Sequence, residues 1–317
     1  MRKALIVGID YYQNISPLFG CVNDSYAVKS VLERHSDGSL NFSTRHETAS
    51  NASNAISRGE LKDSVEELFK DDSDIALFYF AGHGYIENSG GYLITSECTR
   101  GDDGFSLDVL LTIANESPAK NKIIILDSCH SGIAGTPATT GNSALLKEGL
   151  TILTASSSTQ YAQETNGSGV FTSLLVDALN GSASNLVGDI TPGSIYAHID
   201  QSLGPWEQRP IFKTNVKTFT TLRKVQPPIS LTDLKKIVEL FEEPSIEFKL
   251  DPSYEPDSGI PDDENVEKFR ILQKYNRINL VVPVKEEHMY YAAMNSTSCK
   301  LTALGVHYWN LVKNQRI

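Results

Sequence analysis

A cysteine and a histidine in this sequence each follow an apolar run that is typical of a buried strand. Cys129 ends "KIIILDSC" (122–129), and His83 stands between two glycines at the end of "ALFYFAGHG" (76–84). A cysteine nucleophile reacts as its thiolate, and a nearby imidazole can act as the base. In an open parallel sheet, catalytic groups collect beyond the carboxyl ends of the strands. The pair therefore predicts a cysteine–histidine site at that edge if the two strands are neighbours.

His130 is a second candidate for the base. Consecutive side chains at a strand end point to opposite faces, so His130 should point away from the thiol of Cys129, and His83 is preferred. The backbone N–H groups of Gly84 and Cys129 could form an oxyanion hole. Taken alone, Cys129 would more often be a buried structural thiol, and His83 a core histidine. Together, with glycines around the histidine and an acid before the thiol, they favour catalysis.

Alternating strand-like and helix-like runs must position these residues. The pattern predicts an α/β fold, a sandwich of three layers with a mostly parallel central sheet covered by helices on both faces. Thr191 and Pro192 are typical of a helix start, as cap and first helical residue. The predicted strands are 3–10, 74–82, 122–127 and 149–156, and the predicted helices are 24–35, beginning at an Asp24 or Ser25 cap, 58–69, 169–181 and 191–203.

A change of composition near Pro227 and Pro228 indicates a linker, so we predict domains at 1–224 and 225–317. The first would comprise a large portion (1–132), a flexible loop (133–148) and a small portion (149–224). The second should be small, mainly helical and winged-helix-like in one interpretation. It should contain helices at 231–243 and 301–317 and an extended acidic segment at 251–267.

The composition excludes several classes of protein. A net charge of -11 and a pI near 5.1 argue against a nucleic-acid-binding surface, which needs clustered Lys and Arg. No run of 18 apolar residues exists, and the apolar part of the N-terminus is too short for a signal peptide, so we expect a cytoplasmic protein without a membrane segment. The four cysteines lie far apart, which suggests neither a zinc knuckle nor a disulfide framework.

The motifs resemble those of a known family. "YFAGHG" followed by "ILDSCHSG" is similar to the catalytic pair of caspase-like cysteine peptidases, specifically metacaspases and their bacterial relatives. "ALIVGIDYY", "GCVNDSYAVKSVL", and "LTASSSTQYAQET" running into "GVFTSLLVDAL" agree with it. The resemblance covers about residues 3–224 and implies the caspase–hemoglobinase fold. The animal-caspase signature Q-A-C-x-G is absent, which argues against cleavage after aspartate.

The resemblance implies roles for individual residues. Cys129 corresponds to the nucleophile and His83 to the general base. Asp127 and Asp24 match two acids of the S1 pocket, which Ser156 and Ser157 would also line; Asp24 could equally be a helix cap. Two carboxylates in a confined pocket favour a long cation, so the expected substrates are proteins or peptides with Arg or Lys at the cleaved bond.

Two further features are expected by analogy with the family. Family members often cut themselves in the loop after the nucleophile, where Lys147 is the only basic residue between 131 and 148. Many metacaspases bind calcium through an acidic loop, but a solvated loop capping a helix at Ser106 is an equally good interpretation. No cofactor is required and no metal site is assigned; the calcium candidates are Glu97, Asp102, Asp103 and Asp108.

The C-terminal domain offers an aromatic and basic set that could clamp a nucleotide-like ligand, or could be ordinary core aromatics with surface bases. An appended domain is a natural lock on a peptidase, and bacterial caspase-like proteins with such domains resemble immune effectors. We therefore expect a regulated peptidase with a role in stress or antiviral defence, with a non-catalytic signalling scaffold as the alternative. The set comprises Arg270, Arg277, His288, Tyr290, Tyr291, Tyr308 and Trp309.

Overall fold

The computed structural model describes residues 1–317 except 88–89, 129–144, 156–163, 166–167 and 205–208. The chain forms two compact units, Met1–Gln226 and Pro227–Ile317. Within the described ranges, every helix is too short or too polar to traverse a bilayer.

A six-stranded sheet lies at the centre of the first unit, with the strand order β12-β8-β7-β3-β1-β2. All neighbours pair in parallel except β12, which is antiparallel to β8. Every residue of β3 is buried, because the strand is covered on both faces, and its sequence is accordingly a continuous apolar run. The predicted mostly parallel sheet is confirmed. The strands of this sheet are β1 Arg2–Ile9, β2 Ser43–Ala49, β3 Ile75–Ala81, β7 Asn121–Asp127, β8 Leu150–Thr154 and β12 Ile211–Asn215.

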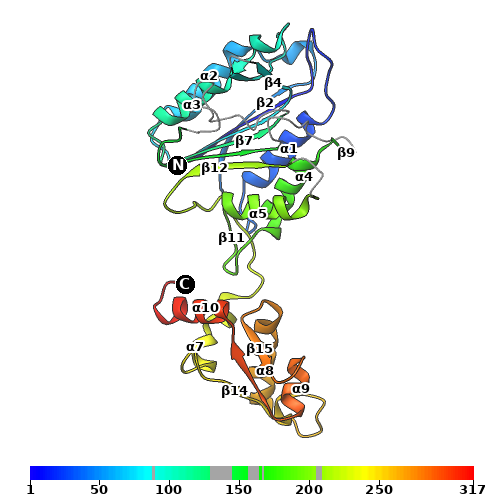
Figure 1. Ribbon diagram of the computed structural model, residues 1–317, viewed down its shortest axis with the longest axis vertical. Coiled ribbons are helices and arrows are strands. Elements are labelled where there is room, and N and C mark those ends of the chain that lie inside the picture. The colour runs from blue at the N-terminus through cyan, green and yellow to red at the C-terminus, as the bar shows by residue number, and fades with distance from the viewer. Residues whose placement is uncertain (88–89, 129–144, 156–163, 166–167, 205–208) are drawn as a thin grey trace. The chain divides into compact units, whose positions relative to one another are not determined.

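Helices cover both faces of the sheet, as Figure 1 shows, and complete the expected three layers. Alternate residues of β1 serve the two sides: Leu5 and Val7 belong to the hydrophobic cluster beneath α2 and α3, whereas Ala4 and Ile6 belong to the cluster beneath α1, α4 and α5. The helices are α1 Cys21–Leu32, α2 Arg58–Phe69, α3 Leu107–Glu116, α4 Val170–Asp177, continued by the π-helical turn η4 Ala178–Ser182, and α5 Pro192–Ser202.

Short elements complete the first unit. A three-stranded antiparallel sheet of order β4-β5-β6 follows β3, and two-stranded pairs join β9 to β10 and β11 to β13. Their bounds are η1 Ala52–Asn54, β4 Gly84–Glu87, β5 Gly90–Leu93, η2 Gly101–Asp103, β6 Phe105–Ser106, β9 Glu164–Thr165, β10 Ser168–Gly169, β11 Asp189–Ile190 and β13 Arg223–Lys224.

Capping residues explain where the helices begin. Thr191 caps α5 with Pro192 in its first turn, as predicted. The predicted start of α1 at an Asp24 or Ser25 cap is wrong, because the helix begins at Cys21. Its N-cap, Gly20, has no side chain, and the carboxylate of Asp10 instead accepts hydrogen bonds from the backbone N–H groups of Cys21 (2.9 Å) and Val22 (3.4 Å).

The second unit combines helices with a three-stranded antiparallel sheet of order β14-β16-β15. The helix expected at 231–243 is two short helices, and the acidic segment 251–267 is not extended: it contains a 3-10 turn and ends inside α8. The elements are α6 Leu231–Lys235, α7 Ile237–Leu240, β14 Phe248–Lys249, η5 Pro252–Tyr254, α8 Asp263–Arg277, β15 Val281–Val284, α9 Met289–Met294, β16 Ser298–Leu301 and α10 Ala303–Lys313.

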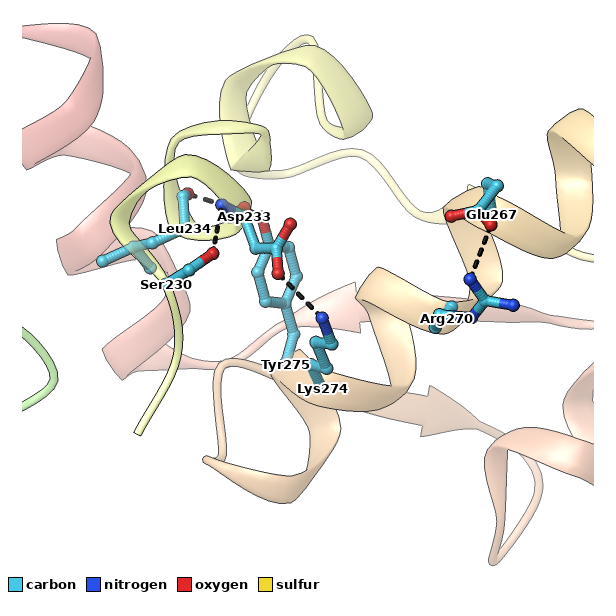
Figure 2. A network of polar contacts seen from close by, with 7 residues as sticks. All are labelled: Ser230, Asp233, Leu234, Glu267, Arg270, Lys274 and Tyr275. Atoms are coloured by element: carbon cyan, nitrogen blue, oxygen red, sulfur yellow. Dashed lines mark hydrogen bonds and ion pairs between the residues drawn. The ribbon is translucent and has the colours of Figure 1, made fainter. Parts of the chain in front are cut away.

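Figure 2 shows how the start of this unit is fastened to α8. Ser230 caps α6 by accepting a hydrogen bond from the N–H of Asp233. The carboxylate of Asp233 pairs with the ammonium of Lys274 at 2.8 Å, and the hydroxyl of the buried Tyr275 donates to the Asp233 carbonyl at 2.5 Å. These contacts join the residues directly after the linker to the core of the second unit.

Candidate active site

The strands that lead to the predicted catalytic residues are direct neighbours. β3 and β7 pair in register with Ala81 opposite Asp127, and the N–H of Gly82 donates to the carbonyl of Asp127 at 3.2 Å. His83 follows Ala81 by two residues, and Cys129 follows Asp127 by two residues in the sequence. Cys129 itself, like His130, Ser156 and Ser157, lies outside the described residues.

His83 is held by the segment that follows β1. Its Nε2 lies 2.9 Å from the carbonyl oxygen of Ser16. A carbonyl can only accept a hydrogen bond, so Nε2 carries the proton in this contact. In the neutral imidazole the other nitrogen, Nδ1, is then unprotonated and can accept a proton. The Ser16 contact therefore sets the tautomer that a general base requires.

Tyr12 holds the backbone of the same histidine. Its buried hydroxyl accepts a hydrogen bond from the His83 N–H at 2.8 Å and donates to the Ile9 carbonyl at 3.1 Å, and the two rings lie 4.7 Å apart. Burial raises the pKa of Tyr12 well above its usual value, so the phenol keeps its proton. A Cβ on Gly82 would lie 2.8 Å from the Tyr12 hydroxyl, which explains the glycine before His83. No motif in the sequence points to Tyr12 or Ser16 as partners of this histidine.

Gly84 begins β4 beside the histidine. The His83 carbonyl accepts a hydrogen bond from the N–H of Ile94 at 2.9 Å, which anchors the chain at this point to the segment after β5. Gly84 is half-buried. Its proposed role in an oxyanion hole shared with Cys129 stays a prediction.

The structure brings the two predicted pocket acids together. Asp24, on α1, and Asp127, at the end of β7, are 4% and 7% exposed. The Oδ2 atom of each acid borders Gly169. A Cβ built on that glycine would lie 3.1 Å from Asp24 Oδ2 and 2.6 Å from Asp127 Oδ2. The N–H of Gly169 donates to Asp24 at 2.9 Å, and the hydroxyl of Thr172 donates to Asp127 at 2.6 Å. These acids thus form one buried pair at the carboxyl end of β7, next to the strand that leads to His83.

A buried tyrosine contacts the threonine that donates to Asp127. The hydroxyl of Tyr79, on β3, lies 2.6 Å from the Thr172 hydroxyl. Burial, with a further contribution from the negative charges of Asp127 and Asp24, raises the pKa of Tyr79 well above its usual value. The two acids could be predicted from the sequence, but Thr172 and Tyr79 could not. Both residues lie in quoted motifs, and only the packing of α4 on the sheet reveals their contact.

Each acid considered for calcium has a protein partner or a helix-end position instead of a shared metal site. Asp103 accepts hydrogen bonds from the hydroxyl of Thr99 (2.7 Å) and from the N–H of Arg100 (3.0 Å). Ser106 caps α3, as the alternative interpretation predicted. Among the described residues, no three His, Cys, Asp or Glu side chains are grouped to hold a metal ion. The other candidates are Glu97, which accepts from the N–H of Arg58, Asp102, which pairs with Arg100, and Asp108 in the first turn of α3.

Lys147, the predicted self-cleavage residue, lies at the amino end of the parallel strands, whereas His83 follows the carboxyl end of β3. Lys147 precedes β8, and its N–H donates to the side chain of Asn115 at 2.9 Å. The next carbonyl, that of Glu148, accepts from the ammonium of Lys122 at the start of β7 (2.7 Å). The structure does not bring Lys147 to the histidine.

The aromatic and basic set of the second unit does not gather as one group. Tyr308 and Trp309 are buried, and the indole N–H of Trp309 donates to the Phe241 carbonyl at 2.7 Å. Tyr290 and Tyr291 are exposed and meet edge to face at 5.4 Å. Of the remaining members, His288 precedes α9 with its ring 6.0 Å from that of Tyr291, Arg270 pairs with Glu267 on α8, and Arg277 ends α8.

Comparisons with known proteins agree on one family. Residues 1–229 match the family model of the caspase domain. Metacaspase-1 of Plasmodium falciparum is 28% identical over 148 residues, which cover 41% of this chain and 24% of that protein. Metacaspase-6 of Arabidopsis thaliana is 28% identical over 145 residues, which cover 41% of this chain and 38% of that protein. The chain thus spans well under half the length of these relatives.

Solved structures show the same fold. Caspase-1 from Spodoptera frugiperda is similar with a TM-score of 0.52 and 15% identity, over 71% of this chain and 91% of that chain. A protein from Geobacter sulfurreducens is similar with a TM-score of 0.53 and 14% identity, over 71% of this chain and 100% of that chain. With the family model matching residues 1–229, the chain belongs to the caspase family of cysteine peptidases and is a distant relative of the metacaspases.

Proposed function

We propose that this chain is a cysteine endopeptidase that cleaves proteins after Arg or Lys. The observation that carries the proposal is the pair of buried acids, Asp24 and Asp127, that meet at Gly169. Buried carboxylates close to one another repel, and a cation between them would relieve that repulsion. The side chains of Arg and Lys are the cations in proteins long enough to enter such a pocket.

In the proposed mechanism, Cys129 is the nucleophile, His83 transfers the protons, and two backbone N–H groups bind the oxyanion. His83, with its Nε2 proton held on the Ser16 carbonyl, would take the thiol proton of Cys129 at Nδ1. The thiolate would attack the carbonyl carbon of the scissile bond, and the N–H groups of Gly84 and Cys129 would bind the oxyanion. His83 would then return the proton to the leaving amine. A water molecule, deprotonated by His83, would hydrolyse the thioester and free the enzyme.

Regulation is assigned to the second unit in this proposal. A peptidase that cleaves after a common residue must be restrained in the cytoplasm, the reducing compartment proposed for this thiol enzyme. The separate core of Pro227–Ile317 supports a lock or sensor that responds to a signal, with a nucleotide-derived messenger and antiviral or stress defence as the proposed setting. The alternative is a catalytically silent scaffold that signals by assembly.

Fluorogenic peptides that end in Arg, Lys, Asp or Gln test the proposal. We expect the full chain to release the fluorophore after Arg and Lys but not after Asp or Gln, and Cys129→Ala and His83→Ala to be inactive. Assays with and without calcium, chelator and nucleotides examine the activation. Turnover after Asp would contradict the assigned specificity, whereas no turnover under any of these conditions would favour the scaffold.

A further inference from the structure

One short segment holds both acids of the proposed S1 pocket. Gly169, the N-cap of α4, donates its N–H to Asp24 Oδ2 at 2.9 Å, and Thr172, in the first turn of that helix, donates its hydroxyl to Asp127 Oδ2 at 2.6 Å. The acids come from α1 and β7, so the start of α4 is the element that joins them. The amino end of a helix also carries partial positive charge, which favours two carboxylates there.

The direction of the hydrogen bonds follows from their chemistry. An ionised carboxylate has no proton and can only accept, so the single hydroxyl proton of Thr172 points to Asp127. The Thr172 oxygen is then left to accept, and the donor is the Tyr79 hydroxyl, 2.6 Å away. Tyr79 keeps its proton because burial and the two nearby negative charges disfavour the phenolate. The bonds therefore run from Tyr79 to Thr172 to Asp127.

Resting on the proposed function, we propose that Thr172 is a positioning residue that sets the specificity of the pocket, and that Tyr79 acts through it. A short carboxylate side chain can occupy several rotamers, and a fixed donor selects one of them. With Oδ2 held by Thr172, the carboxylate is oriented before the substrate cation arrives, which lowers the entropy lost on binding. The expected result is discrimination between a charged and an uncharged side chain of the same shape.

Gly169 supplies the space that this arrangement needs. A Cβ on this residue would lie 2.6 Å from Asp127 Oδ2, closer than carbon and oxygen normally approach. Any side chain here would displace the carboxylate that Thr172 orients. Gly169→Ala therefore gives a further variant that disturbs the same oxygen while Thr172 keeps its hydroxyl.

Steady-state kinetics of the full chain test the proposal, with two peptides that differ only in Arg or its uncharged isostere citrulline at the cleavage site. In Thr172→Val we expect KM for the Arg peptide to rise roughly tenfold or more, because a hydrogen bond to a charged group is lost. Cleavage of the citrulline peptide, which brings no charge to the carboxylate, should fall less. Thr172→Ser restores the donor and should restore the wild-type preference for Arg.

Tyr79→Phe tests the other end of the same hydrogen-bonded chain. It should reduce the Arg preference less than Thr172→Val, and the double variant should match Thr172→Val alone, because both residues act through one hydrogen-bonded chain. Melting temperatures separate this effect from general destabilisation. An unchanged ratio of Arg to citrulline cleavage in Thr172→Val, or a Thr172→Ser protein that fails to restore it, would overturn the proposal.

The proposal and the peptidase function can fail separately. If the wild-type chain cleaves no Arg peptide, the proposed function falls, and binding of the cation agmatine to Cys129→Ala, measured by calorimetry, decides the positioning role. Agmatine binding that Thr172→Val weakens and Thr172→Ser recovers would sustain it. Absence of agmatine binding, or equal binding by all three proteins, would refute it.

Discussion

At the scale of single residues, the candidate site joins a histidine and two acids to the residues that hold them, among them Tyr12 and Thr172. The histidine and the acids could be predicted because each lies in a short motif at the end of an apolar run. Tyr12 and Thr172 could not, because their functional contacts join residues 71 and 45 positions apart. Such contacts depend on how the sheet and helices pack against each other. The periodicity of one segment of sequence carries no information about that packing.

Tyr12→Phe tests the support of the histidine. The change removes the acceptor for the His83 N–H and the donor to the Ile9 carbonyl, so the unfolding free energy should fall by about 1–3 kcal/mol. A displaced imidazole should also lower kcat roughly tenfold or more, with a smaller effect on KM. Tyr26→Phe, at an exposed tyrosine, is the matched control. Wild-type kcat in Tyr12→Phe would exclude a positioning role.

At the scale of elements, four of the six strands of the central sheet and the helices α1, α2, α4 and α5 could be predicted, whereas β2, β12 and α3 were not. The errors in the predicted elements have physical causes. The start of α1 was misplaced because its cap comes from Asp10, eleven positions before Cys21, and not from an adjacent residue. The helix expected at 231–243 divides at Lys236, where no glycine or proline signals a break. Asp24, misjudged as a candidate cap, is instead bonded to the start of α4.

Asp10→Ala should weaken α1. The variant removes the acceptor for two N–H groups at the amino end of the helix, and losses of this kind cost about 0.5–2 kcal/mol of unfolding free energy. Chemical denaturation measures the change. Asp10→Asn keeps an acceptor oxygen and should recover most of the stability; if it is as unstable as Asp10→Ala, the capping explanation fails.

Two histidines should make the first unit less stable in mild acid. Burial is the main cause that lowers the pKa of His35 and of His46 below the usual value near 6.5. The unfolded chain then binds more protons as the pH falls below 6.5, so stability should decrease until the lowered folded-state pKa values are passed. His35 also accepts a hydrogen bond from the Lys224 N–H at Nδ1, which protonation would break.

The double variant His35→Asn and His46→Gln places an amide oxygen near the acceptor Nδ1 of His35 and an amide N–H near Nε2 of His46, without a titratable ring. Denaturation midpoints measured between pH 5 and 7 should change less with pH in this variant than in the wild type. An identical pH dependence would show that other groups control the acid response.

At the scale of the whole molecule, the division at Gln226 and Pro227 separates the peptidase from its proposed lock. A chain that ends at Gln226 retains every residue of the proposed site. If the second unit restrains the peptidase, this shortened chain should cleave Arg peptides faster than the full chain in the absence of any activator. Equal or lower activity, in a shortened chain with an intact thermal transition, would argue against restraint by the second unit.

The position of Lys147 bears on the kinetics of self-cleavage. Residues around it are bonded to Asn115 and Lys122 at the amino edge of the sheet, and His83 lies past the carboxyl edge, roughly 20 Å away along seven-residue strands. A chain cannot bring this bond to its own histidine without breaking those contacts, so a cut at Lys147 should come from a second molecule.

The rate at which fragments appear should therefore rise with the square of protein concentration, and Lys147→Ala should abolish them. A rate simply proportional to concentration would indicate a unimolecular cut. In the bimolecular case, a dilute population would persist intact, whereas crowding of the molecules would start a self-accelerating conversion, so the fold would make the enzyme responsive to its own abundance.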